Sequence, residues 1–130
     1  MFKITIDRPR RLMSIELSGL LSADDVGDLS QQQQAMVMAR GWRTGSFLLL
    51  VDATACIIQP QDVVRAFQYI VDFSAIKAAR IAVVRGDSPI GTQTRRILPY
   101  DGTQMFGTMA EAEEWLFQDP PSTIPLLAVG

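Results

Sequence analysis

The chain has 130 residues, a formal net charge of −2 and an isoelectric point near 5.0. Hydrophobic residues make up 48% of it and charged residues 20%, which is typical of one soluble globular domain with a substantial core. The acidic balance argues against a general nucleic-acid binder, because such proteins usually carry a basic surface.

The cysteine and histidine counts exclude several mechanisms. The single cysteine, Cys56, cannot form an intramolecular disulfide, which fits a reducing compartment. The absence of histidine excludes Ser–His–Asp and Cys–His catalysis, and one cysteine alone does not make the usual zinc ligand sets. The N-terminus is charged where a signal peptide would be apolar, and no apolar run approaches the roughly 18 residues of a membrane span. We therefore expect a cytoplasmic protein without a cofactor or a bound metal.

The first part of the chain predicts a β-hairpin and a helix. Apolar and polar residues alternate over residues 2–7 and 12–18, on either side of the turn Arg8–Arg11. The three arginines of this turn either form a docking patch for an acidic partner or simply keep the turn solvated and discourage edge pairing, and we favour the second. Ser22 is a good N-cap for the helix that follows, and Gly41 fits its end.

The next strand and helix are the best-defined unit of the sequence. Phe47–Val51 is an unbroken apolar run closed by Asp52, which is typical of a strand buried on both faces. Ala53–Gln59 is predicted to be a loop. Pro60 opens a strongly amphipathic helix that is predicted to end near Lys77.

The rest of the chain continues the alternation of strands and helices. The predicted elements are a strand over 79–85, a helix capped by Ser88, a strand over 103–106 and a final helix capped by Thr108. The order β-β-α-β-α-β-α-β-α predicts one layered α/β domain over residues 1–118, with a mixed, mostly parallel sheet. Residues 119–130 form a proline-rich tail that is also apolar, so it either packs across the domain or contacts a second copy in a homodimer.

No motif for a dinucleotide, a P-loop phosphate site or a nucleophile elbow occurs. Four carboxylates could still meet where parallel strands end and hold a divalent cation: Asp52, Asp62, Asp87 and Asp101. Each of them also has a simpler role in a turn or at a helix terminus, which we favour.

The loop after the central strand contains an unusual apolar group. We expect Cys56 to be a buried, unreactive thiol. The two isoleucines that follow, Ile57 and Ile58, either line a pocket, face a partner or cover the core.

The opening hairpin, the segments FLLLVD and ARIAVVRGDS, and the segment DGTQMFGTMAEAEEWL resemble the STAS family, in particular the SpoIIAA-like anti-sigma-factor antagonists. The resemblance covers about residues 1–118 and implies a layered domain with most helices on one side of the sheet. It also implies a regulatory protein that binds a partner kinase.

Regulatory members of that family carry a phosphorylatable serine, in a D-S-S-G-like motif, where the helix after the central strand begins. Here the matching residues 59–63 read QPQDV and contain no serine, threonine or glycine. The nearest hydroxyl, Thr54, does not fit the motif, so the phospho-switch is not carried over. Asp62 would instead place a fixed negative charge at that position.

Our leading hypothesis is a small, non-catalytic binding module whose contact surface is the loop 53–61 and the first half of the next helix. The contact candidates are Thr54, Cys56, Ile57, Ile58, Gln61, Asp62 and Phe67. A second hypothesis is an apolar ligand, such as an acyl chain, in a pocket lined by Ile57, Ile58, Phe67 and Trp115. The least favoured is an enzyme that uses the strand-edge carboxylates Asp52 and Asp87.

Overall fold

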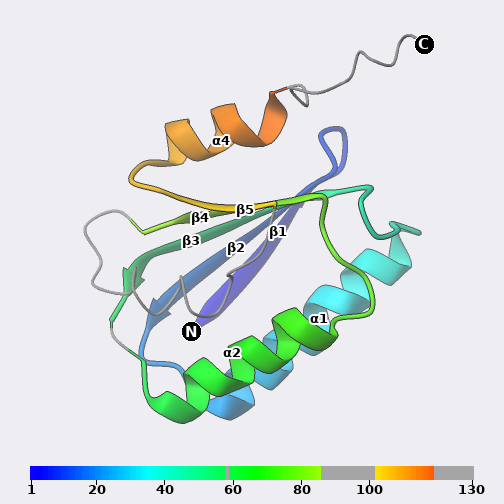
Figure 1. The fold of residues 1–130 in the computed structure, drawn as a ribbon. Helices are drawn as coiled ribbons and strands as arrows, with labels where there is room; N and C mark the ends of the chain where they lie inside the picture. The colour runs from blue at the N-terminus through cyan, green and yellow to red at the C-terminus, as the bar shows by residue number, and fades with distance from the viewer. Residues whose placement is uncertain (58, 86–101, 119–130) are drawn as a thin grey trace, which may run out of the picture.

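The computed structural model describes residues 1–57, 59–85 and 102–118 (Figure 1). The described strands are β1 (Phe2–Asp7), β2 (Leu12–Gly19), β3 (Leu48–Cys56), β4 (Arg80–Val84) and β5 (Thr103–Phe106). The described helices are α1 (Ala23–Ala39), α2 (Gln61–Phe73) and α4 (Met109–Phe117). The predicted helix after Ser88, the tail 119–130, and Ile58, Asp87 and Asp101 lie outside the described residues.

The strands form one sheet in the order β1-β2-β3-β4-β5. β1 runs antiparallel to β2, and the other neighbours run parallel to each other. The predicted fold class, a mixed and mostly parallel sheet that begins with a hairpin, is therefore confirmed.

Helices cover both faces of the sheet (Figure 1). On one face α1 and α2 pack against residues such as Met13, Leu49 and Val83, in the larger of two buried clusters. On the other face α4 packs through Ala112 and Leu116 against a second cluster, which includes Leu12, Leu50, Ala82 and Val84. Because successive side chains of a strand point to opposite faces, the apolar runs of β3 and β4 supply both clusters at once.

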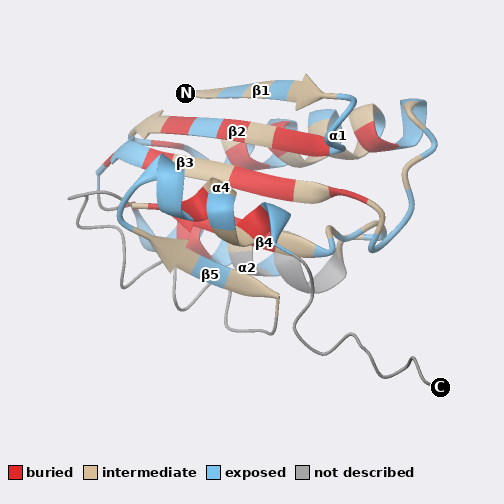
Figure 2. Ribbon diagram, turned by 90° about the horizontal axis from the view of Figure 1, so that it is seen from above, coloured by how far each residue is buried: buried red, intermediate tan, exposed pale blue. Residues whose placement is uncertain are grey.

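The face beneath α4 is covered only in part, because α4 packs over β3, β4 and β5. On the same face β1 and β2 carry polar side chains, among them Lys3, Thr5, Ser14 and Glu16, of which all but the half-buried Ser14 are exposed (Figure 2). This difference explains why β1 and β2 alternate apolar with polar residues, whereas the first part of β3 and the part of β4 after Arg80 are unbroken apolar runs.

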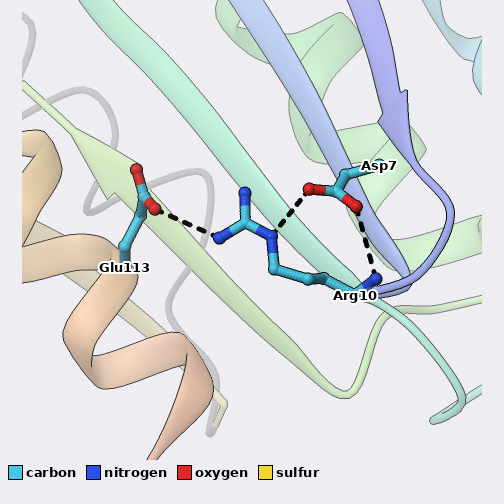
Figure 3. A network of polar contacts seen from close by, with 3 residues as sticks. All are labelled: Asp7, Arg10 and Glu113. Carbon is cyan, nitrogen blue, oxygen red and sulfur yellow. Dashed lines mark hydrogen bonds and ion pairs between the residues drawn. The ribbon is translucent and has the colours of Figure 1, made fainter.

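Two arginines fasten α4 to the sheet. Arg80 of β4 donates to the carbonyl oxygens of Trp115 and Gln118, both at 2.8 Å, and so satisfies the end of the helix. Arg10 of the hairpin turn contacts the Glu113 carboxylate at 3.3 Å and the Asp7 carboxylate at 2.6 Å (Figure 3). Both predictions for the arginine turn were therefore incomplete, because Arg10 binds the chain itself.

Two element boundaries differ from the prediction. β3 continues through residues 53–56, which were predicted to be loop, because β2 extends to Gly19 and keeps pairing with it. α2 ends at Phe73 rather than near Lys77, since Ser74 takes an extended backbone with ψ of 133°. The predicted N-caps Ser22 and Thr108 are confirmed, as the Ser22 hydroxyl accepts from the Asp25 amide and the Thr108 hydroxyl from the Glu111 amide.

The aromatic contact between Trp42 and Phe47 provides a test of this core. Phe47 is 1% exposed, and its ring stacks on that of Trp42 with centroids 5.3 Å apart. Phe47→Ala should lower the free energy of unfolding by about 3–5 kcal/mol, measured by denaturant titration, because it leaves a cavity beside β3. The control Met38→Ala, at a side chain 67% exposed, should change it by less than about 0.5 kcal/mol. Equal effects of the two substitutions would contradict the assignment of the core.

Candidate functional site

A β-bulge shapes the end of β3. Glu16 pairs with Asp52 and Ser18 pairs with Ala55, so β3 advances by three residues where β2 advances by two. The Asp52 carboxylate accepts hydrogen bonds from the Thr54 amide at 3.0 Å and the Thr54 hydroxyl at 2.6 Å. The prediction that Asp52 closes the strand was wrong, because pairing with β2 continues beyond it. Its carboxylate instead holds the bulge, which leaves the neighbouring Thr54 and Ala55 exposed.

Gln59 joins the chain that leaves β2 to the chain that leaves β3. Its side-chain oxygen accepts from the buried Leu21 amide at 2.8 Å, and its amide nitrogen donates to the carbonyl oxygens of Gly19 at 2.8 Å and Ile57 at 2.6 Å. The residue itself is buried, with 6% exposure. Gln59 therefore supplies partners to backbone groups that both strand exits would otherwise leave unpaired.

The two strand exits each carry an exposed apolar residue at the same edge of the sheet. Gly19 and Cys56 are the last paired residues of β2 and β3, so Leu20 and Ile57 follow at the same edge of the sheet. Leu20 is 59% exposed and Ile57 is 51% exposed. Gly19 turns the chain at this point with a φ of 67°, which favours glycine. We call Leu20 and Ile57 the exit patch.

The chain around the exit patch is acidic. Residues 19–28 and 56–64 contain four aspartates and no lysine or arginine: Asp24, Asp25, Asp28 and Asp62. Two cations lie directly beside these segments, the Met1 amino group, which donates to the Ser18 carbonyl at 3.0 Å, and Arg65. Hydrogen bonds from the backbone amide and hydroxyl of Ser22 hold the pKa of Asp25 below its ordinary value, so this carboxylate stays charged. The macrodipoles of α1 and α2 also favour anions in their first turns.

The structure separates the predicted contact residues into exposed and buried ones. Thr54, Ile57, Gln61 and Asp62 are exposed at the end of β3 and the beginning of α2. Cys56 is buried, as predicted, with 4% exposure, and its burial raises the pKa of the thiol. Phe67 is partly buried and packs on the core beneath α1 and α2, so only part of its side chain is accessible to a partner.

The predicted apolar pocket is contradicted by the fold. Phe67 packs in the cluster beneath α1 and α2, whereas Trp115 packs with Phe106 on the face covered by α4. The sheet lies between these two clusters, so Phe67 and Trp115 cannot line one pocket with Ile57.

Two residues of this site, Leu20 and Gln59, could not be predicted from the sequence. Leu20 and Leu21 are adjacent leucines, and only the ladder with β3 decides that the second is buried and the first exposed. Gln59 carries no local signal, because its partners lie 38 to 40 residues away.

Among the residues that the structure describes, no three His, Cys, Asp or Glu side chains are grouped so as to hold a metal ion. Within the same residues, no helix has the length and apolar content to cross a membrane.

The sequence matches no protein-family model and no curated protein. Its fold, however, is similar to solved structures. An uncharacterised protein of the DUF3478 family, from Shewanella loihica PV-4 and described as having a SpoIIAA-like fold, aligns over 88% of this chain and 93% of its own at 16% identity, with a TM-score of 0.66. The fold of this chain is SpoIIAA-like.

Two further structures agree with this assignment. The anti-sigma factor antagonist SpoIIAA in its unphosphorylated form aligns over 88% of this chain and 94% of its own at 13% identity, with a TM-score of 0.58. An anti-sigma factor antagonist from Mycobacterium paratuberculosis aligns over 91% and 96% at 13% identity, with a TM-score of 0.55. The resemblance seen in the sequence is thereby confirmed at the level of the fold.

The role of Gln59 can be tested by truncation. Gln59→Ala leaves the buried Leu21 amide and the Gly19 carbonyl without their partner, at about 1–3 kcal/mol for each group. We expect a loss of about 2–4 kcal/mol in unfolding free energy, together with faster hydrogen exchange at Leu21. The matched control is Gln61→Ala, at an exposed position of α2, which should be nearly neutral. A neutral Gln59→Ala would show that the two exits are held by other contacts.

The thiol of Cys56 gives a second test. Because burial both raises its pKa and shields the sulfur, the reaction of the native protein with an aromatic disulfide reagent at pH 8 should be far slower than that of the protein in denaturant. Raising the pH towards the ordinary thiol pKa should speed the native reaction only slightly. Native and unfolded protein reacting at the same rate would contradict the burial of Cys56.

Proposed function

We propose that this chain is a non-catalytic regulatory module that binds another protein through the exit patch and the first turn of α2. The observation that carries the proposal is the exposure of Leu20 and Ile57, side by side on neighbouring strand exits. Single exposed apolar residues are common on protein surfaces, so the proposal rests on two of them leaving adjacent, paired strands at one edge of the sheet.

The exit patch is well held, which favours a binding role. The backbone on either side of it is fixed by the β2–β3 ladder and by the three hydrogen bonds of Gln59. A contact surface fixed before binding loses less conformational entropy when the complex forms. The exposed residues Thr54, Gln61 and Asp62 surround it and would form the polar rim of such an interface.

The charge near the exit patch indicates the chemistry of the partner. Because the four aspartates outnumber the two cations beside these segments, the Met1 amino group and Arg65, the complementary surface would present apolar side chains flanked by lysine or arginine. Association with such a surface should weaken as salt is added, since these carboxylates lie near solvent.

The similar structures support a protein partner. Two of them are anti-sigma factor antagonists, a description that names another protein as the one acted upon. In this chain Asp62, exposed in the first turn of α2, would supply a fixed negative charge where relatives of this fold carry a switchable serine. The module would then bind its partner constitutively, without a phosphorylation step.

An affinity capture from the source organism tests the proposal. We expect the wild-type chain and the control Met38→Asp to retain the same partner protein, because Met38 is exposed on α1 away from the strand exits. The double variant Leu20→Asp, Ile57→Asp should lose that partner while keeping its circular dichroism spectrum. Retention of the partner by the folded double variant would remove the exit patch from the interface.

The contribution of Asp62 is tested separately with the captured partner. Asp62→Asn should weaken binding a few-fold at low salt and have little effect at high salt, because it removes one surface charge. Glu114→Gln, at an exposed carboxylate on α4, serves as the matched control, because α4 lies away from the strand exits. If Asp62→Asn and Asp62→Ser both leave the affinity unchanged at low salt, the fixed-charge hypothesis fails.

A further inference from the structure

β1 lies at one edge of the sheet that the described strands form (Figure 2). The outer side of an edge strand presents backbone N–H and C=O groups. Met1 and Ser18 exchange backbone hydrogen bonds at 3.0 and 2.9 Å, so they form a bonded pair of the β1–β2 ladder. Bonded pairs recur at every second residue of an antiparallel ladder. The N–H and C=O groups of Phe2, Ile4 and Ile6 therefore point away from β2.

A hydrogen bond on the far side of β2 agrees with this alternation. The Leu48 amide donates to the Arg11 carbonyl at 2.8 Å, which shows that the odd-numbered residues of β2 direct their backbone groups towards β3. The even-numbered residues of β2 then face β1, as the pairing of Ser18 with Met1 requires.

Within the part of the chain that the structure describes, the outer side of β1 has little of the usual protection of an edge strand. Natural edges are commonly blocked by a proline, a bulge or an unmatched charge. β1 contains no proline, and its six residues pair with β2 in one regular register from Phe2–Leu17 to Asp7–Leu12. Its cation, Lys3, is the one feature of the strand that would oppose pairing with another strand.

The sequence of β1 makes that cation compatible with a second copy of the same strand. In an antiparallel pairing with Thr5 opposite Thr5, Lys3 stands opposite Asp7 and Ile4 opposite Ile6. The outward backbone groups of Ile4 and Ile6 then meet, and two opposite-charge pairs form on the exposed face. The Asp7 carboxylate already accepts from Arg10, but each carboxylate oxygen can accept more than one hydrogen bond.

The neighbouring register is less favourable. If Ile4 were opposite Ile4, Lys3 would stand opposite Thr5, and its charge would have no partner across the interface. In either register the half-exposed apolar row of β1 would be extended by the same row of the second copy, which covers more of Phe2, Ile4 and Ile6. Only the register centred on Thr5 satisfies the charges as well.

We infer that two copies of this chain associate through β1, antiparallel and with Thr5 on the two-fold axis, into one continuous sheet. This inference is independent of the proposed function, because it concerns an edge of the sheet and not the exit patch. An unrelated extended peptide could use the same backbone groups, but it would not share the Lys3–Asp7 complementarity.

Disulfide trapping tests both the dimer and its register in the full chain. Opposed residues of a non-bonded antiparallel pair have Cα atoms about 4.5 Å apart, which is within the range of a disulfide. Thr5→Cys should therefore form a covalent dimer under mild oxidation. In Lys3→Cys the two cysteines would be four residues out of register, roughly 13 Å apart, and should not join. The buried Cys56 stays in place in both variants.

Sedimentation equilibrium completes the test. We expect the wild-type chain to show a concentration-dependent dimer, and Lys3→Glu to raise the dissociation constant about tenfold, because it places two like-charge pairs across the axis. A wild-type chain that is monomeric at all concentrations would overturn the inference. So would a dimer in which Thr5→Cys fails to crosslink, or one in which Lys3→Cys crosslinks equally well, since the contact would then lie elsewhere or in another register.

Discussion

The parallel pairing of β2 with β3 is the constraint on which the rest of the structure depends. It sets the last paired residues, Gly19 and Cys56, and so decides that Leu20 and Ile57 leave the sheet side by side. It also requires a bulge at Asp52, because the two strands reach this edge with unequal numbers of residues. Gln59 then satisfies the backbone of both exits from a single buried side chain. The candidate contact surface is thus a consequence of strand register, not of a local motif.

The unequal covering of the two faces explains the remaining features. α1 and α2 cover one face, whereas α4 covers only the β3–β5 part of the other. The short helix α4 would be weakly held by its two buried residues alone, and Arg80 and Arg10 add polar contacts at different points along it. The part of that face outside α4 ends at β1, and within residues 1–57, 59–85 and 102–118 no strand pairs with its outer side. The two proposed association surfaces are therefore separate, one at the exits of β2 and β3 and the other at the outer edge of β1.

The fold was predictable from the sequence because it rests on local signals. Alternation in β1 and β2, the apolar runs of β3 and β4, and the caps Ser22 and Thr108 each identify an element without knowledge of its neighbours. The errors fall where a distant partner decides the outcome. Residues 53–56 are strand because β2 extends beside them. Arg10 contacts Glu113, which lies 103 residues further along the chain, so no local pattern could reveal its structural role. The prediction of one pocket lined by both Phe67 and Trp115 was wrong, because periodicity does not tell which face of the sheet a helix will cover.

The central claim is that the exit patch and the first turn of α2 form a protein-binding surface. Backbone amide hydrogen exchange, compared for the free chain and for its complex with the captured partner, tests it most directly. We expect added protection at residues 20–21 and 57–62, with exchange in α4 unchanged. Added protection confined to α4, or to the outer surface of α1, would contradict the claim, because those segments lie away from the exits of β2 and β3.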